Sequence, residues 1–171
     1  DSVSFAFIPD YYMTEYHYPG SQKMKDMIRN IEGRRTFGAW EIMARAMLLC
    51  GYRFASIDIQ NRKVDTKKTA VLAVPSARYM DSDIQAKLVD YMRSGGGILL
   101  YGEVPSLDME GESCTILADA MGIEPKKVHY ASPSYYLSVY SEGWAAPRPE
   151  VRVDYAQTFN MERGEAILRI Y

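Results

Sequence analysis

Charged side chains follow several apolar stretches of this sequence, and they are the first candidates for chemistry. Asp10, Asp58 and Glu103 lie near the ends of runs that are typical of buried β-strands, and Arg78 follows another such run. Open parallel sheets bind ligands at the carboxyl ends of their strands. Two carboxylates about 5–10 Å apart could cleave a glycosidic bond, but acidic residues at strand ends also form turns. We therefore expect Asp10, Arg78 and Glu103 to line a binding cleft or an interface.

Tyrosine is the unusual component of the composition, with 14 residues. Many of them crowd two segments, one near the N-terminus and one near position 135. Tyrosine joins an apolar ring to a polar tip, which suits sugar stacking and protein interfaces equally. The alternative is a set of half-buried loop and strand tyrosines, because aromatic residues also favour strands. The candidates for a binding or interface surface are Tyr11, Tyr12, Tyr16 and Tyr79, with Tyr18 and Trp144 as further stacking platforms.

Nucleophilic catalysis has few candidate residues in this chain. A triad needs a nucleophile on a tight turn between a strand and a helix, and a histidine base beside it. Ser76 follows a strand-like run, but its neighbours do not form a Gly-x-Ser-x-Gly turn, and His17 and His129 have no partner at a recognisable spacing. Free cysteines such as Cys50 and Cys114 are more often buried structural residues than nucleophiles. We predict no catalytic residue, with a cysteine enzyme as an open alternative.

Metal and cofactor sites lack a recognisable pattern as well. Two lone histidines and two distant cysteines do not have zinc-site spacing. The run 81–83, Asp-Ser-Asp, resembles part of a calcium loop, but it lacks the glycine and the distal glutamate, and helix capping explains it. The glycine run 95–97 follows an expected helix, which is the wrong end of a helix for a phosphate site. We predict neither a metal nor a cofactor, and we interpret the glycines as a helix stop.

The segment 69–102 predicts a strand, a helix and a second strand. Its two apolar runs, 71–74 and 98–101, are typical of parallel strands that are covered on both faces. Between them lies an amphipathic helix, which we expect to begin at a capping box on Ser82. A parallel pair needs such a crossover, and the crossover is almost always right-handed.

The remaining elements extend this unit in both directions. We expect a strand at 3–8, a helix at 36–50 that Gly51 ends, a strand at 54–60, a short helix capped by Ser113, and a β-rich tail after 125. This order predicts an α/β fold, namely a flavodoxin-like three-layer sandwich with a mostly parallel sheet and a β-rich C-terminal tail. We predict a single domain at 1–171, with a core at 1–125 and an antiparallel extension at 126–171. Both ends lie in strand-like sequence, so we expect it to be excised from a longer protein.

Composition and charge exclude some classes of partner. The net charge is −2 and no long run has one sign, so we predict no nucleic-acid partner. No apolar run approaches the ~18 residues of a membrane span, so we predict no membrane partner. Two cysteines do not decide the redox compartment, and cytoplasmic and extracytoplasmic locations both stay open.

Two stretches of the sequence carry a family resemblance. A strand leads into Pro-Ser-Ala-Arg-Tyr-Met at 75–80, and a helix ends in Leu-Val-Asp-Tyr-Met-Arg-Ser-Gly-Gly-Gly at 88–97. With the upstream helix, glycine and strand, the segment 36–122 resembles the class I glutamine amidotransferase-like domains. More narrowly, it resembles the trimerisation domain of the β-galactosidases in glycoside hydrolase family forty-two. True amidotransferases carry a Cys nucleophile at a turn between strand and helix; no expected strand here ends in Cys, and the trimerisation domain also lacks that nucleophile.

The resemblance implies a non-catalytic domain of a multidomain, β-galactosidase-like glycoside hydrolase. Such a domain would support assembly or cap the active site of a neighbouring barrel. Its implied partners are other domains of the parent chain and identical subunits, with carbohydrate as a further ligand. Two alternatives stay open: a carbohydrate-binding module that uses the Tyr-rich loop, and an independent amidotransferase-like cysteine enzyme.

Overall fold

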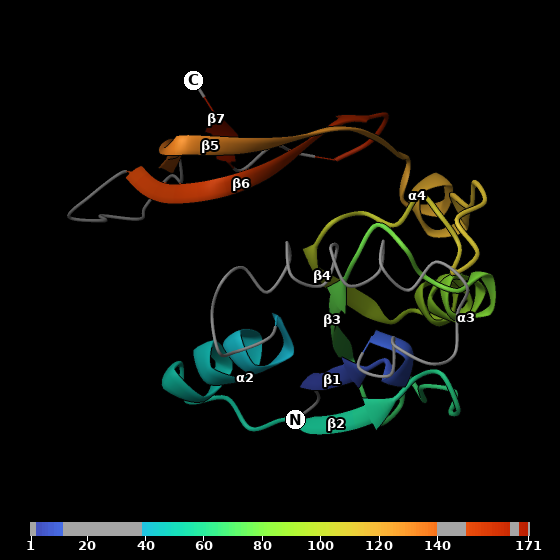
Figure 1. Cartoon of the computed structure of the whole chain (residues 1–171). Helices are drawn as coiled ribbons and strands as arrows, with labels where there is room; N and C mark the ends of the chain where they lie inside the picture. The colour runs from blue at the N-terminus through green and yellow to red at the C-terminus, as the bar shows by residue number, and fades with distance from the viewer. Residues whose placement is uncertain (1–2, 12–38, 140–149, 165–167, 171) are drawn as a thin grey trace. The chain divides into compact units, whose positions relative to one another are not determined.

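A computed structural model describes residues 3–11, 39–139, 150–164 and 168–170, and divides the chain into two compact units, 1–120 and 121–171. The predicted single domain with its core at 1–125 stays a prediction. The elements are β1 Val3–Phe7, η1 Pro9–Tyr11, α2 Ala39–Leu49, β2 Ala55–Asp58, β3 Val71–Ser76, α3 Ser82–Arg93, β4 Gly97–Gly102, α4 Ile116–Met121, β5 Ile123–Val139, β6 Glu150–Met161 and β7 Leu168–Ile170 (Figure 1). Among the described residues, no helix is long and apolar enough to cross a membrane.

A four-stranded parallel sheet lies at the centre of the first unit. Its strand order is β2-β1-β3-β4, and every neighbouring pair is parallel. This order matches the first four strands of the flavodoxin-like arrangement. Figure 1 shows α2 and α3 on opposite sides of the sheet, and α3 forms the predicted crossover between β3 and β4. The α/β class is therefore confirmed.

One face of this sheet packs against α2. Phe5, Ala73 and Leu99 are paired across β1, β3 and β4, so their side chains point to the same face. Met43 and Ala44 of α2 pack on Phe5 and Ala73, and these four side chains form a buried cluster. The helix therefore covers the middle of the sheet.

The strand β4 corrects one expectation. The apolar run on β3 is covered on both faces from its second residue onward, because Leu72, Ala73 and Val74 are fully buried while Val71 is 37% exposed. The run on β4 is not, since Leu99 is 50% exposed and Tyr101 is 43% exposed. Among the described strands, β4 lies at the edge of this sheet. The exposure of Leu99 and Tyr101 shows that the prediction of a run covered on both faces is wrong for β4.

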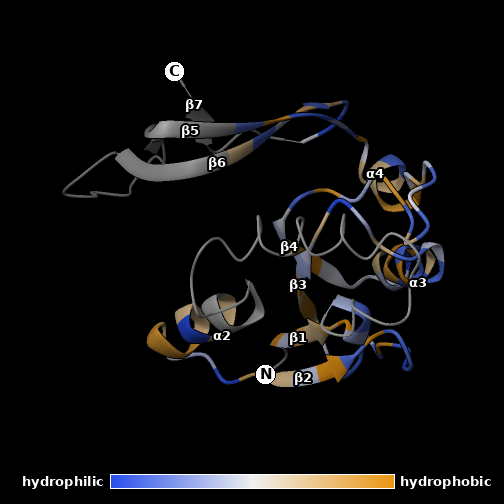
Figure 2. Ribbon diagram, in the orientation of Figure 1, coloured by the Kyte–Doolittle hydropathy of each residue, from blue (hydrophilic) through white to orange (hydrophobic). Residues whose placement is uncertain are grey.

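The helix α3 is amphipathic, as predicted, and Figure 2 shows hydrophilic and apolar residues on it. Its capping residue differs from the prediction. The backbone N–H of Asp83 donates to the carboxylate of Asp81 at 2.8 Å, so Asp81 and not Ser82 is the N-cap. The C-terminal end follows the prediction, because Gly95 has a positive φ of 91° and ends the helix after Ser94.

The predicted C-terminal end of α2 is observed, whereas the predicted start of α4 is not. Gly51 has a φ of +79°, and the N–H of Tyr52 donates to the carbonyl of Met47 at 3.0 Å, which is the predicted glycine stop. α4 begins at Ile116, whereas Ser113 pairs with a neighbouring loop in an isolated β-bridge. The predicted cap at Ser113 is therefore wrong.

The second unit holds an antiparallel sheet with the order β6-β5-β7, as predicted for the tail. At the base of the β5–β6 hairpin, Ile123 faces Met161 and Pro125 faces Phe159 across the strands. The opposite face is polar, because the amide of Asn160 donates to the carboxylate of Glu124 at 3.0 Å. At this end of β5 and β6, apolar and polar residues alternate along each strand, as expected for strands with one apolar and one polar face.

Candidate functional site

The predicted surface residues meet where β1, β3 and β4 end. The hydroxyl of Tyr11 donates to the backbone carbonyl of Tyr79 at 2.7 Å, and the N–H of Ala77 donates to that hydroxyl at 3.3 Å. Arg78 Nε lies 3.1 Å from Glu103 Oε2. The structure thus brings together four of the predicted residues from three segments of the chain. We call Tyr11, Arg78, Tyr79 and Glu103 the strand-end cluster.

The ion pair of this cluster is unevenly buried. The side chain of Glu103 is 3% exposed, whereas that of Arg78 is 42% exposed. A buried carboxylate is costly unless it is paired and hydrogen-bonded, so the guanidinium of Arg78 keeps Glu103 in place. Because Arg78 reaches solvent, screening weakens the attraction between the two charges.

The serine at this edge is engaged in holding the two strands together. Ser76 is buried, and its Oγ donates to the carbonyl of Glu103 at 2.6 Å. The N–H of Glu103 in turn donates to the carbonyl of Ser76 at 3.2 Å. Gly102 permits this approach, because its φ is +117° and a Cβ there would lie 2.1 Å from the carbonyl oxygen of Ser76. A hydroxyl used in this way is not poised as a nucleophile.

Tyr11 is also engaged. Burial raises the pKa of its phenol, and the nearby negative charges of Asp10 and Glu103 raise this pKa further. The hydroxyl therefore stays protonated in the ordinary pH range and serves as a structural donor to the loop after β3. This use of the hydroxyl disfavours Tyr11 as a freely presented sugar-stacking residue.

The carboxylates considered for glycoside cleavage have other roles in this structure. Asp58 Oδ1 accepts the N–H groups of Gln60 and Asn61 at 3.1 Å each, and Asn61 Nδ2 donates to Asp58 Oδ2 at 2.8 Å. These hydrogen bonds, led by the one from the Asn61 side chain, lower the pKa of Asp58. Asp10 is linked to the same turn, because its N–H donates to Gln60 Oε1 at 3.2 Å. Asp58 is therefore a turn residue, as acidic residues at strand ends often are.

Several other candidates can now be placed. Cys114 is buried and Cys50 is exposed, and neither forms a disulfide. The described residues contain no group of three or more His, Cys, Asp or Glu side chains that could hold a metal ion. Tyr12, Tyr16 and Trp144 lie outside the described residues, as do Tyr18 and His17.

Sequence reasoning missed Gln85, which is fully buried on α3. Its Nε2 donates to the carbonyls of Met80 at 2.9 Å and Cys114 at 3.3 Å, and its Oε1 accepts the N–H of Leu117 at 3.2 Å. Gln85 thereby joins α3 to the loop that carries Arg78 and to the start of α4. Nothing in the sequence marks it, because a glutamine in an amphipathic helix is typical of the solvent side.

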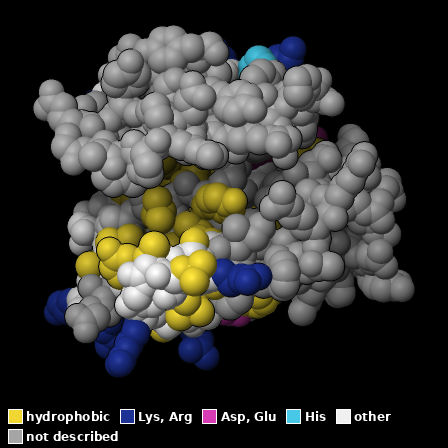
Figure 3. Space-filling model, turned by 90° about the vertical axis from the view of Figure 1, so that its left-hand side faces the viewer, with side chains coloured by type: hydrophobic (Ala, Val, Ile, Leu, Met, Phe, Trp, Pro, Cys, Tyr) yellow, Lys and Arg dark blue, Asp and Glu magenta, His cyan; other side chains and the backbone are white. Residues whose placement is uncertain are grey.

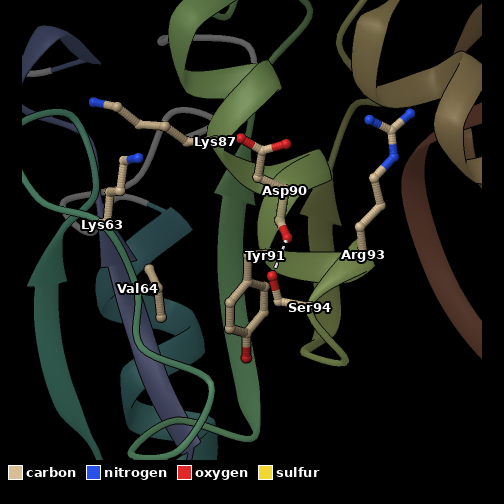
Figure 4. Close-up of a pocket in the computed structure, with 7 residues that line it drawn as sticks. All are labelled: Lys63, Val64, Lys87, Asp90, Tyr91, Arg93 and Ser94. Carbon is tan, nitrogen blue, oxygen red and sulfur yellow. Dashed lines mark hydrogen bonds between the residues drawn. The ribbon is translucent and has the colours of Figure 1, made fainter.

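A pocket of about 380 Å3 lies beside α3 and the loop before β3 (Figure 4). Three cations line it, but they do not converge. Figure 4 shows Arg93 pointing away from Lys63 and Lys87, and the Lys87 ammonium donates to the carbonyls of Ile59 and Gln60. The cations of this pocket are therefore not arranged to hold one anionic ligand.

Residues 22–166 match the model of a protein family described as GLMA-like, second domain. A β-1,2-glucosyltransferase from Ignavibacterium album is 28% identical over 134 residues, which is 71% of this chain and 18% of that protein. An exo-β-D-glucosaminidase from Pyrococcus horikoshii is 33% identical over 73 residues, 41% of this chain and 9% of that protein. The chain thus spans less than a fifth of these curated relatives.

Solved structures of β-galactosidases share the fold. The enzyme from Halorubrum lacusprofundi has a TM-score of 0.69 at 15% identity, and a catalytic mutant of a family forty-two enzyme from G. stearothermophilus has a TM-score of 0.65 at 15% identity. Both similarities cover 99% of this chain and 24% of the β-galactosidase chain. The resemblance to a domain of these enzymes is therefore confirmed at the level of the fold.

Proposed function

Because the chain belongs to the GLMA-like second-domain family, we propose that it is a non-catalytic domain of a multidomain glycoside hydrolase. In this role it supports assembly of the enzyme or caps the active site of a neighbouring domain. Relatives named as a glucosaminidase and as β-galactosidases favour this class of parent protein. They also favour a site of catalysis elsewhere, because the chain matches only a quarter of each β-galactosidase.

The observation that carries this proposal is the closed strand-end cluster. In a parallel sheet this edge is where a ligand or a nucleophile would be expected. Here Ser76 and Tyr11 donate their hydroxyl hydrogens to backbone carbonyls, and the buried carboxylate of Glu103 pairs with Arg78. Each group stabilises the loops rather than facing a substrate.

The first test is the activity of the 171-residue chain on aryl β-galactosides and aryl β-glucosaminides. We expect no hydrolysis above that of a buffer blank, and hydrolysis by the longer polypeptide that contains this chain. Hydrolysis by the chain that survives repurification would refute the proposal. Glycosyl transfer without hydrolysis by the longer polypeptide would favour a parent like the named glucosyltransferase instead.

The second test separates the two roles. Light scattering across a concentration series gives the solution mass of the chain. A closed oligomer would support assembly through this domain. A monomer at every concentration would support capping within one polypeptide.

A further inference from the structure

The strand β4 has one backbone edge that no described strand pairs with. Its other edge pairs with β3 over six residues without a bulge. The N–H groups of Gly97, at its start, and Glu103, just past its end, donate to backbone carbonyls on the β3 side at 2.8 and 3.2 Å. Backbone groups alternate between the two edges of a strand, so Ile98 and Leu100 direct their N–H and C=O groups to the open edge. An edge of this kind is a template for one more strand.

This open edge lacks the features with which proteins prevent strand pairing. Edge strands are usually short, interrupted by a bulge or a proline, or marked by a charged side chain. β4 has the sequence Gly-Ile-Leu-Leu-Tyr-Gly, which contains neither a charge nor a proline, and none of its six residues is buried. The opposite edge of the sheet differs, because β2 has only four residues and ends in the carboxylate of Asp58. β4 is therefore the edge at which a partner strand is expected.

The side chains of β4 are apolar on both faces of the sheet. Leu99 pairs with Ala73, so Leu99 and Tyr101 point to the face that α2 covers, where they are 50% and 43% exposed. Figure 3 shows hydrophobic side chains gathered on the side of the molecule where α2 lies. Ile98 and Leu100 point to the opposite face, on which α3 lies, and are half-buried. A strand that pairs with this edge must therefore be apolar on both of its own faces.

A second copy of β4 meets these requirements. A two-fold axis perpendicular to the sheet sets two β4 strands antiparallel and keeps the α2 faces of both copies on one side. With the axis at Leu99, each Ile98 lies opposite Leu100 of the second copy, and both pairs exchange backbone hydrogen bonds. Leu99 then faces its own copy, and the ring of Tyr101 lies over Gly97, which has no side chain to exclude it. The pairing buries no charged side chain, because β4 carries none.

We propose that two copies of this chain associate through the open edge of β4, which joins their parallel sheets into one continuous sheet. An axis at Leu100 instead would set Ile98 opposite Gly102, whose φ of +117° departs from a strand, so the axis lies at Leu99. This interface serves the assembly role proposed above, and the inference rests on that role. The pair closes at two copies, since each chain has one such edge and uses it once.

Disulfide trapping tests the pairing and its register. The 171-residue chain with Cys50→Ser lacks its exposed native thiol, and Leu99→Cys in this background places two thiols at the two-fold axis. Residues opposite each other at a non-hydrogen-bonded position of an antiparallel pair have Cα atoms about 4.5 Å apart, which a disulfide can bridge. We expect mild oxidation to convert most of the Leu99→Cys chain into a covalent dimer. A chain that stays monomeric after oxidation would overturn the proposal.

Tyr101→Cys in the same background is the matched control. It lies on the same face of β4 and is exposed to a similar extent. In the proposed register it is four residues from the matching position of the second copy, so the two Cα atoms lie about 13 Å apart, too far for a disulfide. We expect no covalent dimer from this variant. Equal trapping of Leu99→Cys and Tyr101→Cys would overturn the pairing, because random collisions do not depend on register.

Light scattering of the unchanged chain is an independent test. We expect a mass near twice the 19.5 kDa of one chain at the upper end of the concentration series. Leu99→Lys sets two like charges opposite each other at the axis and should leave a monomer, whereas Ile116→Lys, at an exposed position of α4, should keep the mass of the unchanged chain. A dimer that Leu99→Lys leaves intact would overturn the interface. A mass of three chains would also overturn it, because this edge closes at two copies, but would still support an assembly role.

Amide hydrogen exchange shows whether another strand occupies this edge. In the proposed dimer, the amides of Ile98 and Leu100 should exchange at least about tenfold more slowly at high than at low concentration, because their N–H groups become hydrogen-bonded. Slow exchange of both amides in a monomer would mean that another segment of the chain covers the edge, and would overturn the proposal. Fast exchange in a monomer would overturn it as well. Both of these results leave a capping role within one polypeptide, so hydrolysis by the longer polypeptide still decides the proposed function separately.

Discussion

Replacing Gly102 with alanine should open the strand-end cluster at its tightest point. At φ +117° an L-residue is strained, and such strain costs about 1–3 kcal/mol. The new Cβ would lie 2.1 Å from the carbonyl oxygen of Ser76, which is backbone and cannot rotate away. The two strand ends must therefore separate and weaken two hydrogen bonds between Ser76 and Glu103, each contributing about 1 kcal/mol. We expect a total loss of about 3–5 kcal/mol in the free energy of unfolding.

Gly51→Ala is the matched control. Gly51 also has a positive φ, of 79°, but a Cβ there would meet nothing within 4 Å. Its cost should be the backbone strain alone, about 1–2 kcal/mol. Urea unfolding followed by circular dichroism measures both variants. With a slope of about 2 kcal/mol/M, the midpoint should fall by about 2 M for Gly102→Ala and by less than about 1 M for Gly51→Ala. Equal shifts would refute the argument that the close approach to Ser76, and not the φ angle, limits this position.

Three further perturbations test the residues around the cluster. Gln85→Met keeps the side-chain volume but leaves buried backbone groups without their hydrogen-bond partner, so the free energy of unfolding should fall by about 2–5 kcal/mol. Ala86→Met, on the exposed side of the same helix, should change this free energy by under about 0.5 kcal/mol. Similar urea midpoints for the two variants would contradict the role of Gln85. Burial raises the pKa of Tyr11 in the folded chain, so its contribution to stability is complete below the pKa of the unfolded chain, near 10, and is lost as the pH rises above that value. In thermal melts from pH 8 to 11, Tyr11→Phe should therefore lose less Tm with rising pH than the unchanged protein. An identical dependence of Tm on pH in both proteins would speak against a buried phenol. Arg78→Met should destabilise the chain by about 1–3 kcal/mol by leaving Glu103 unpaired, and less in a Glu103→Gln background; a double-mutant cycle with no coupling would rule out the ion pair as a stabilising contact.

The central part of the fold could be predicted because each level of the sequence agrees there. The apolar runs, the amphipathic helix and the glycine at 95 all indicate one strand-helix-strand unit, and the structure contains it. The role of Gly51 as a helix stop was predictable for the same reason, since a left-handed backbone conformation at a helix end favours glycine. Local rules suffice where the hydrogen bonds involved are themselves local.

The wrong predictions concern features that depend on contacts with distant parts of the chain. Asp81 and Ser82 are both good N-caps by type, and the loop before α3 decides between them. The exposure of Leu99 depends on β4 being the edge of the sheet, which no local pattern reveals. The strand-end positions of Arg78 and Glu103 were predictable, but their pairing was not, because it joins residues from two different strand ends.

The strand order has a consequence for the way the chain is made and folds. β1 lies between β2 and β3, so Val3, near the start of the chain, pairs with Val71, and Phe5 pairs with Ser56 on its other side. During synthesis from the N-terminus, β1 leaves the ribosome long before either neighbour exists. Until then, an apolar strand with two unpaired edges is available for wrong partners. Pairing over such a separation also makes folding slow, because the long loop must close before its contacts form. The nascent chain is therefore most exposed to wrong pairing between the synthesis of β1 and the synthesis of β3. Slower translation after β3 would give the sheet time to close correctly.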